Sequence, residues 1–125
     1  MYHFLMGTND WKAINAGVMP YVARVQSIIE QALAVDPRVA VMYHTILPRT
    51  DLQSTATNFE ANRQTCNAMM RSWISNQDPA RVVLCDFGMN ESIGDASRND
   101  ALRIHDGIHL SRAGDQSAAA ICAAA

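Results

Sequence analysis

Apolar residues along the chain fall into two kinds of pattern, short continuous runs and longer stretches with helical spacing. Tyr2 to Met6 is a short, mostly apolar run that ends at Gly7. This pattern predicts a strand that is buried on both faces. The next stretch repeats at steps of three and four residues and stops at Asp36-Pro37, which predicts an amphipathic helix. Its apolar positions are Val18, Val22, Val25, Ile29 and Leu33.

The same alternation continues through the rest of the chain. Arg38 to Tyr43 and Arg81 to Phe87 are further apolar runs and predict two more strands. Between them lies a helical face that ends at Asp78-Pro79. Gly88 to His105 is a long polar segment, and such segments are often functional loops. Ser111 is then expected to cap a last, Ala-rich helix. The helical face between the strands is made by Phe59, Cys66, Met70 and Trp73.

Strands that alternate with helices predict an α/β domain with a parallel sheet and helices on both faces. We expect residues 1–125 to form one domain of this kind. In such sheets the ligand site lies beyond the carboxyl ends of the strands. Asn9, His44 and Asp86 each follow or end a predicted strand. The segment with Asp106 and His109 follows the last strand, so polar groups are expected to gather at one edge.

Composition narrows the possible partners. The chain has 125 residues, 49% of them hydrophobic, and a net charge of -2 without basic or acidic blocks. This charge pattern gives no reason to expect nucleic acid or an anionic membrane as partner, and small neutral ligands remain open. No segment is apolar for long enough to span a bilayer. Three cysteines with no paired spacing indicate buried thiols rather than a disulfide framework.

Two short motifs carry the candidate chemistry. Gly7-Thr8-Asn9-Asp10 follows the first strand, and Asp106-Gly107-Ile108-His109-Leu110-Ser111 precedes the last helix. An Asp three residues before a His can accept a hydrogen bond from the imidazole and fix its tautomer, with Gly107 allowing the turn. In this order and on an α/β scaffold, the pair resembles the SGNH, or GDSL-type, serine hydrolases. The resemblance covers nearly the whole chain.

The resemblance implies a flavodoxin-like, three-layer α/β/α fold and cofactor-independent hydrolysis of carboxylic esters, with a small ester or acylated sugar as substrate. Asn9 resembles the side-chain donor of the family's oxyanion hole, and Gly7 the residue that lets the strand end approach the site. His109 and Asp106 resemble the base and the acid of its triad. Asp10, Trp11 and His44 are expected beside the site, although each has a simpler structural interpretation.

The chain departs from the family pattern at its start. The family's Gly-Asp-Ser motif with the nucleophile, and a glycine that provides a second oxyanion donor, both precede the Asn motif, and no such blocks stand before Gly7. The chain begins on the strand that the family counts third, so we expect an incomplete sheet of about three strands. Its first strand would then have an open edge, available to another chain or to an N-terminal segment.

Three alternatives follow from the same residues. Gly94-Asp95-Ala96-Ser97 superficially resembles the missing block, but Ser97 follows no strand and is more readily explained as a loop serine. A metal site is a weaker alternative, and we expect none. The domain could also be non-catalytic and bind a ligand, or need another segment to complete its site. The candidate ligands for a metal are His44, Cys85, His105, Asp106 and His109.

Overall fold

A computed structural model of the protein describes residues 1–49, 51, 58–90, 93–94 and 108–125. Its centre is a three-stranded parallel sheet in the order β1-β2-β3. The strands are β1 (Tyr2–Leu5), β2 (Val41–His44) and β3 (Val82–Cys85). Leu5 pairs with His44, and His44 pairs with Cys85. All three carboxyl ends therefore meet at one edge, as the sequence predicted for a parallel α/β sheet.

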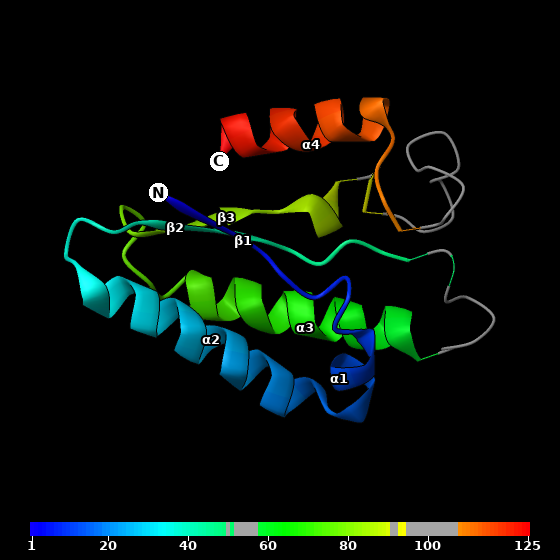
Figure 1. Ribbon diagram of the computed structural model, residues 1–125, viewed down its shortest axis with the longest axis horizontal. Coiled ribbons are helices and arrows are strands. Elements are labelled where there is room, and N and C mark those ends of the chain that lie inside the picture. Colours follow the sequence, from blue (N-terminus) through cyan, green and yellow to red (C-terminus); the bar gives the residue numbers. More distant parts are fainter. Residues whose placement is uncertain (50, 52–57, 91–92, 95–107) are drawn as a thin grey trace.

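Helices cover both faces of the sheet (Figure 1). Helices α1 (Trp11–Ala16), α2 (Val18–Val35) and α3 (Phe59–Ile74) lie on one face, and α4 (Arg112–Ala124) lies on the other. A 3-10 turn, η1 (Phe87–Met89), follows β3. The predicted helix–sheet–helix layering is thus present, built here on three strands.

The larger core lies between the sheet and α1 to α3. Side chains of a strand alternate between its two faces, so Val41 and Tyr43 of β2 point into this core and both are fully buried. Val25 and Ile29 of α2 pack there, as does Met70 of α3. Burying a side chain of this size stabilises the fold by roughly 1.5–3 kcal/mol. The apolar faces of the helices and the alternate residues of the strands therefore pack together on one face of the sheet.

A smaller cluster lies between the sheet and α4. Met42 and Cys85 point to this side because they alternate with the residues of the larger core. Phe87 completes the buried part, and Ile121 and Cys122 of α4 pack against it while remaining half-buried. Helix α4 begins at Ser111, whose hydroxyl accepts a hydrogen bond from the Gly114 N–H at 3.3 Å. The predicted cap is confirmed.

The prediction that the first strand is buried on both faces was wrong. Tyr2 is 60% exposed and Leu5 is 66% exposed, while Phe4 is only partly buried against the larger core. The physical reason is position, because β1 stands at the end of the sheet and pairs with β2 along one edge. Among the described residues, no strand pairs with its other edge.

Two local features also differ from the sequence prediction. Residues 11–16 form α1, whereas the sequence predicted helix only from Val18 onward. His44 ends β2 and is buried, whereas the sequence placed it in the following loop. In the described part of the chain, no helix is long and apolar enough to cross a membrane.

Candidate functional site

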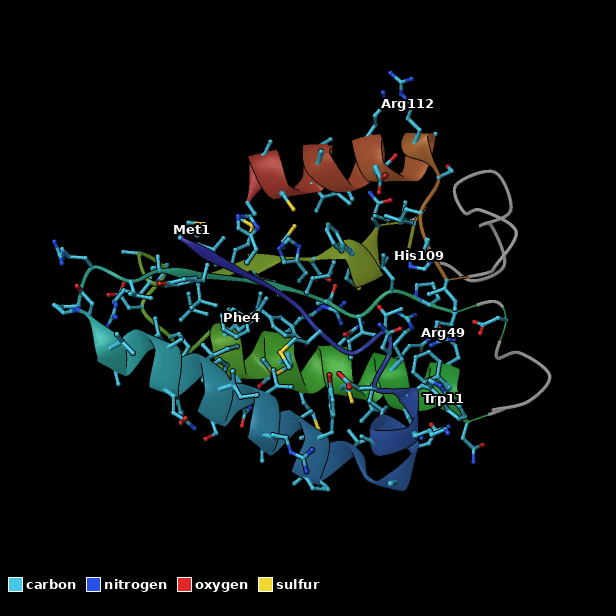
Figure 2. The ribbon with its side chains drawn as sticks, in the orientation of Figure 1. Met1, Phe4, Trp11, Arg49, His109 and Arg112 are labelled. Carbon is cyan, nitrogen blue, oxygen red and sulfur yellow. The ribbon has the colours of Figure 1, made fainter. Side chains whose placement is uncertain are left out.

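A cavity of about 620 Å³ opens at the carboxyl edge of the sheet. Its walls come from the end of β1, the end of β2 and the segment that leads into α4. Asn9 and His109, which stand at opposite ends of the sequence, both line it. Figure 2 shows His109 beside this segment, on the α4 side of the sheet. Other predicted site residues on the walls are Gly7, Asp10 and His44.

Gly7 makes the turn from β1 into the site. Its φ is 109°, a conformation that residues with a side chain rarely adopt. An added Cβ would lie only 2.6 Å from Cγ1 of Ile46, a buried residue just beyond β2. Both the torsion and the space require glycine here. The close packing on Ile46 fixes where the chain leaves β1 and hence where Asn9 stands.

Asn9 presents an amide to the cavity. The residue is exposed, and its side chain makes no hydrogen bond to any described residue. An Asn after a strand often bonds the backbone of its own turn, but no such contact is made to the described residues. Just before it, the Thr8 carbonyl accepts a hydrogen bond from Arg49 Nη1 at 2.8 Å. Arg49 in turn pairs with Asp51, with Nη2 and Oδ2 2.6 Å apart.

Asp10 links the same loop to α2. Its carboxylate accepts a long hydrogen bond of 3.5 Å from the Tyr21 hydroxyl. Burial is the main reason that the pKa of Tyr21 lies well above its usual value, and the neighbouring Tyr43 and Asp10 add to the shift. Tyr21 therefore stays a neutral donor at physiological pH. Asp10 thus both contacts α2 and lines the cavity.

His44 is a buried residue that lines the cavity. One ring nitrogen, Nε2, lies 3.1 Å from Nδ1 of His3, and the other, Nδ1, lies 3.7 Å from the sulfur of Cys122. The ring also packs against Phe87, with centroids 5.0 Å apart. Burial, and secondly the neighbouring His3, lower the pKa of His44 below its usual value. The imidazole is therefore neutral at neutral pH.

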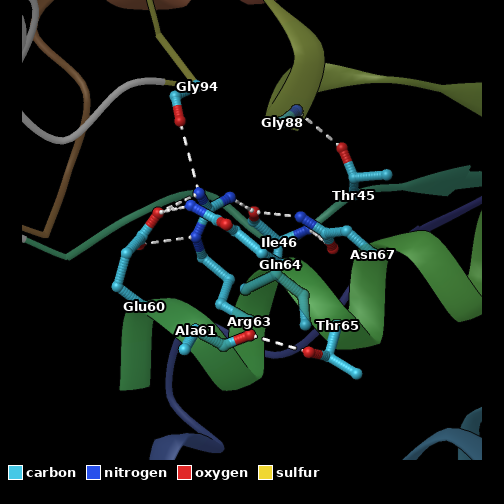
Figure 3. A network of polar contacts seen from close by, with 10 residues as sticks. All are labelled: Thr45, Ile46, Glu60, Ala61, Arg63, Gln64, Thr65, Asn67, Gly88 and Gly94. Carbon is cyan, nitrogen blue, oxygen red and sulfur yellow. Dashed lines mark hydrogen bonds and ion pairs between the residues drawn. The ribbon is translucent and has the colours of Figure 1, made fainter. Parts of the chain in front are cut away.

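Buried polar contacts support the chain just beyond β2 (Figure 3). Asn67 of α3 accepts from the Ile46 N–H at 2.8 Å and donates to the Ile46 carbonyl at 2.9 Å. Arg63 donates to the same carbonyl at 2.7 Å and forms an ion pair with Glu60. Helix α3 thus provides the backbone partners that a neighbouring strand would otherwise supply, and it fixes the residue on which Gly7 packs.

A second cavity, of about 470 Å³, lies beside this network. Its charged side chains are already engaged, because Arg63 pairs with Glu60 and Arg71 pairs with Asp86 at 2.7 Å. Burial would raise the pKa of Asp86, but the hydrogen bonds and charge of Arg71 outweigh it, and the pKa is lowered. Thr45 adds a hydrogen bond to Asp86 at 3.0 Å. We assign these groups a structural role.

The remaining predicted residues lie elsewhere or outside the described part of the chain. Trp11 packs against the larger core, on the α1 side of the sheet, and is not among the residues that line the first cavity (Figure 2). Lys12 places its amino group 5.5 Å from the centre of the Trp11 ring. Asp106, Ser97 and His105 lie outside the described residues. His109 is exposed.

Sequence reasoning missed two residues at this edge. Arg49 holds the loop that carries Asn9, and Cys122 approaches His44 from α4. Both contacts join positions far apart in the sequence, so no local spacing could have indicated them. Cys85 stands nearby, and burial together with a hydrogen bond to Cys122 raises its pKa to about 12.

Comparison with known proteins gives one informative likeness. No family model matches the chain, and no curated protein matches it. A solved structure of a protein from Streptococcus pneumonia, described as "a putative platelet activating factor", superposes with a TM-score of 0.75 at 20% identity. The match covers 98% of this chain and 57% of that protein, so this chain spans little more than half of its length. At this identity the likeness shows a shared α/β fold.

Proposed function

We propose that this domain belongs to an SGNH-type ester-hydrolase lineage and carries the base and the oxyanion donor of the site. The observation that carries the proposal is that Asn9 and His109 line one cavity at the carboxyl edge of a parallel sheet. An exposed amide that makes no hydrogen bond to the described residues is suited to donate to a developing oxyanion. The fold shared with the Streptococcus protein supports the same lineage.

In this proposal each residue has one task. His109 takes the proton from an attacking serine hydroxyl and later gives it to the leaving alcohol, while Asp106 orients the imidazole. The Asn9 amide donates to the carbonyl oxygen as negative charge develops on it. The printed sequence has no Gly-Asp-Ser block before Gly7. The serine is therefore expected from a segment or chain that completes the site, and the acyl group of the substrate is left open.

The test follows hydrolysis of p-nitrophenyl acetate and labelling by a fluorophosphonate, which reports an activated serine whatever the substrate. In protein that includes the segment with the serine, we expect His109→Ala and Asn9→Ala to lower the hydrolysis rate, the latter by about 100-fold or more if the amide is the oxyanion donor. Imidazole added to His109→Ala is expected to restore part of the rate. Asn76→Ala, which removes an exposed amide at the far end of α3, is the matched control.

The labelling locates the nucleophile. A fluorophosphonate adduct that is lost in His109→Ala would identify the serine by peptide mapping, whether in this chain or in a completing segment. If neither variant changes ester hydrolysis in any form of the protein, and no adduct forms on folded protein, the hydrolase proposal is wrong and the non-catalytic alternative stands.

A second function concerns the open edge of β1. Tyr2 and Leu5 are largely exposed on a strand that pairs only with β2 among the described residues. An unpaired, apolar edge is a template for another strand. We propose that a strand from an N-terminal segment or another chain pairs here. Hydrogen–deuterium exchange of the β1 amides, slowed on addition of the completing segment, would test it, and unchanged exchange would contradict it.

A further inference from the structure

Three metal-ligand side chains from three separate elements meet between the sheet and α4. They are His44 at the end of β2, Cys85 at the end of β3 and Cys122 in α4. One ligand atom from each lies within 4.8 Å of the others. His44 and Cys85 are paired neighbours in the sheet, so their side chains leave the same face side by side. Cys122 comes down onto them from the helix that covers this face.

The separations fit a tetrahedral zinc site. With Zn–S near 2.3 Å and Zn–N near 2.0–2.1 Å, tetrahedral angles place ligand atoms about 3.5–3.8 Å apart. His44 Nδ1 and Cys122 Sγ are 3.7 Å apart. The other separations are at most 4.8 Å, so they need to close by about 1.3 Å at most. Small side-chain rotations can provide that movement.

The surroundings of His44 also suit a ligand. A metal-bound histidine usually donates its other ring N–H to a neighbour, which fixes the tautomer and the ring orientation. Here Nδ1 faces the thiol and Nε2 lies 3.1 Å from His3 Nδ1. With the metal on Nδ1, the Nε2–H donates to His3. One ring nitrogen then binds the metal and the other donates a hydrogen bond.

The chemistry of the donors selects the kind of ion. Two thiols and one imidazole favour Zn²⁺ or Cu(I) over Mg²⁺ or Ca²⁺, which prefer oxygen ligands. We propose that His44, Cys85 and Cys122 bind one Zn²⁺ and thereby hold α4 against the sheet. Binding displaces the protons of both thiols and leaves the fourth position to water or another small ligand. His44 also lines the 620 Å³ cavity, which gives the ion a route of entry.

The same residues show why sequence alone favoured no metal. The set considered there combined His44 and Cys85 with His105, Asp106 and His109. Within the described part of the chain, the group that meets contains Cys122 instead, and His109 is not a member. Cys122 has no neighbouring ligand residue in the sequence that would mark it, and only the packing of α4 brings it to the site.

The test uses Co²⁺ as a spectroscopic substitute in reduced, metal-free protein. Wild type is expected to bind one equivalent with thiolate-to-cobalt charge-transfer bands and the strong visible bands of a tetrahedral ion, and Zn²⁺ should displace it. In Cys122→Ser we expect weaker charge transfer and Zn²⁺ affinity at least about tenfold lower. Cys66→Ala is the matched control, because Cys66 is a buried thiol in the other core. It should bind like wild type.

A second variant distinguishes the residues that bind the metal from His3, which orients one of them. His3→Ala should keep the charge-transfer bands but weaken Zn²⁺ binding by about 10–100-fold, as expected when the residue that orients a ligand is lost. The proposal is overturned if folded wild type shows no thiolate charge transfer, or if Cys122→Ser binds as tightly as wild type. It is also overturned if reduced protein binds no metal and oxidation only joins Cys85 to Cys122. None of these readouts depends on ester hydrolysis.

Discussion

Removing the Asn67 side chain should destabilise the fold more than its small size suggests. Asn67 is 1% exposed and bonds both the N–H and the carbonyl of Ile46. In Asn67→Ala the Ile46 carbonyl keeps its bond from Arg63 at 2.7 Å, but the N–H loses the partner it has here. A buried donor left without a partner costs about 1–3 kcal/mol. Alanine's better helix propensity returns only about 0.5 kcal/mol.

We therefore expect the free energy of unfolding to fall by about 0.5–2.5 kcal/mol. Urea denaturation followed by circular dichroism measures it, with an unchanged slope confirming that the change lies in stability. The matched control is Thr65→Ala on the same helix, also drawn in Figure 3. Thr65 is exposed, and its hydroxyl donates to the Ala61 carbonyl of its own helix at 2.9 Å. That variant should stay within about 0.5 kcal/mol of wild type.

If Asn67→Ala matched Thr65→Ala within about 0.5 kcal/mol, the idea that α3 supplies essential backbone partners to the chain after β2 would be refuted. The support of Ile46, and through it of the Gly7 turn, would then have to come from apolar packing alone. A loss well above about 3 kcal/mol would instead indicate that the bonds of Arg63 to the same region also fail.

Three further predictions concern other parts of the fold. Gly7→Ala should lower the free energy of unfolding, measured in urea, by about 2–4 kcal/mol, because it combines a strained φ with a clash on Ile46. A loss below about 1 kcal/mol would contradict this packing. Tyr43→Phe should leave the free energy of unfolding unchanged or raise it by up to about 1–2 kcal/mol, since the buried Tyr43 hydroxyl has no hydrogen-bond partner in the described structure. A clear loss of stability would show that the hydroxyl has an additional partner. In metal-free protein, Cys122 should react with iodoacetamide well before Cys66. Cys122 is half-buried, whereas Cys66 is buried and this burial raises its pKa to about 11. Peptide mass analysis gives the order of labelling, and the reverse order would contradict the assigned burial.

The sequence was sufficient for the elements whose apolar pattern is long enough to show a period. Helix α2 has 18 residues and α3 has 16, so each repeats its apolar face several times. Helix α1 has six residues, fewer than two turns, and then meets Gly17, so its period could not be recognised. The apolar run of β1 predicted a strand but not its exposure, because exposure depends on which segments lie beside it in space.

The residues of the candidate site also fall into those that the sequence predicted and those that it did not. Asn9 and His109 were predicted as site residues because each belongs to a short motif, and both line the cavity. Arg49 was missed because its contact to Thr8 spans 41 positions, and Cys122 because its contact to His44 spans 78. Such contacts are made by the parallel sheet, which aligns the ends of distant strands, and by the helix above it. A motif can identify a group that acts, but the groups that hold it in place become visible only in the fold.

The open edge of β1 and the cavity are adjacent in the structure. Leu5 lies on the open strand and also lines the cavity, and it is 66% exposed. A strand added beside β1 would pair with its free edge and extend the sheet next to this wall, so its carboxyl end would lie beside Asn9. A segment that paired with β1 in this way would be well placed to bring a nucleophile to Asn9 and His109. Protection of the β1 amides and appearance of a fluorophosphonate adduct should therefore occur together, and protection without an adduct would separate completion of the fold from completion of the active site.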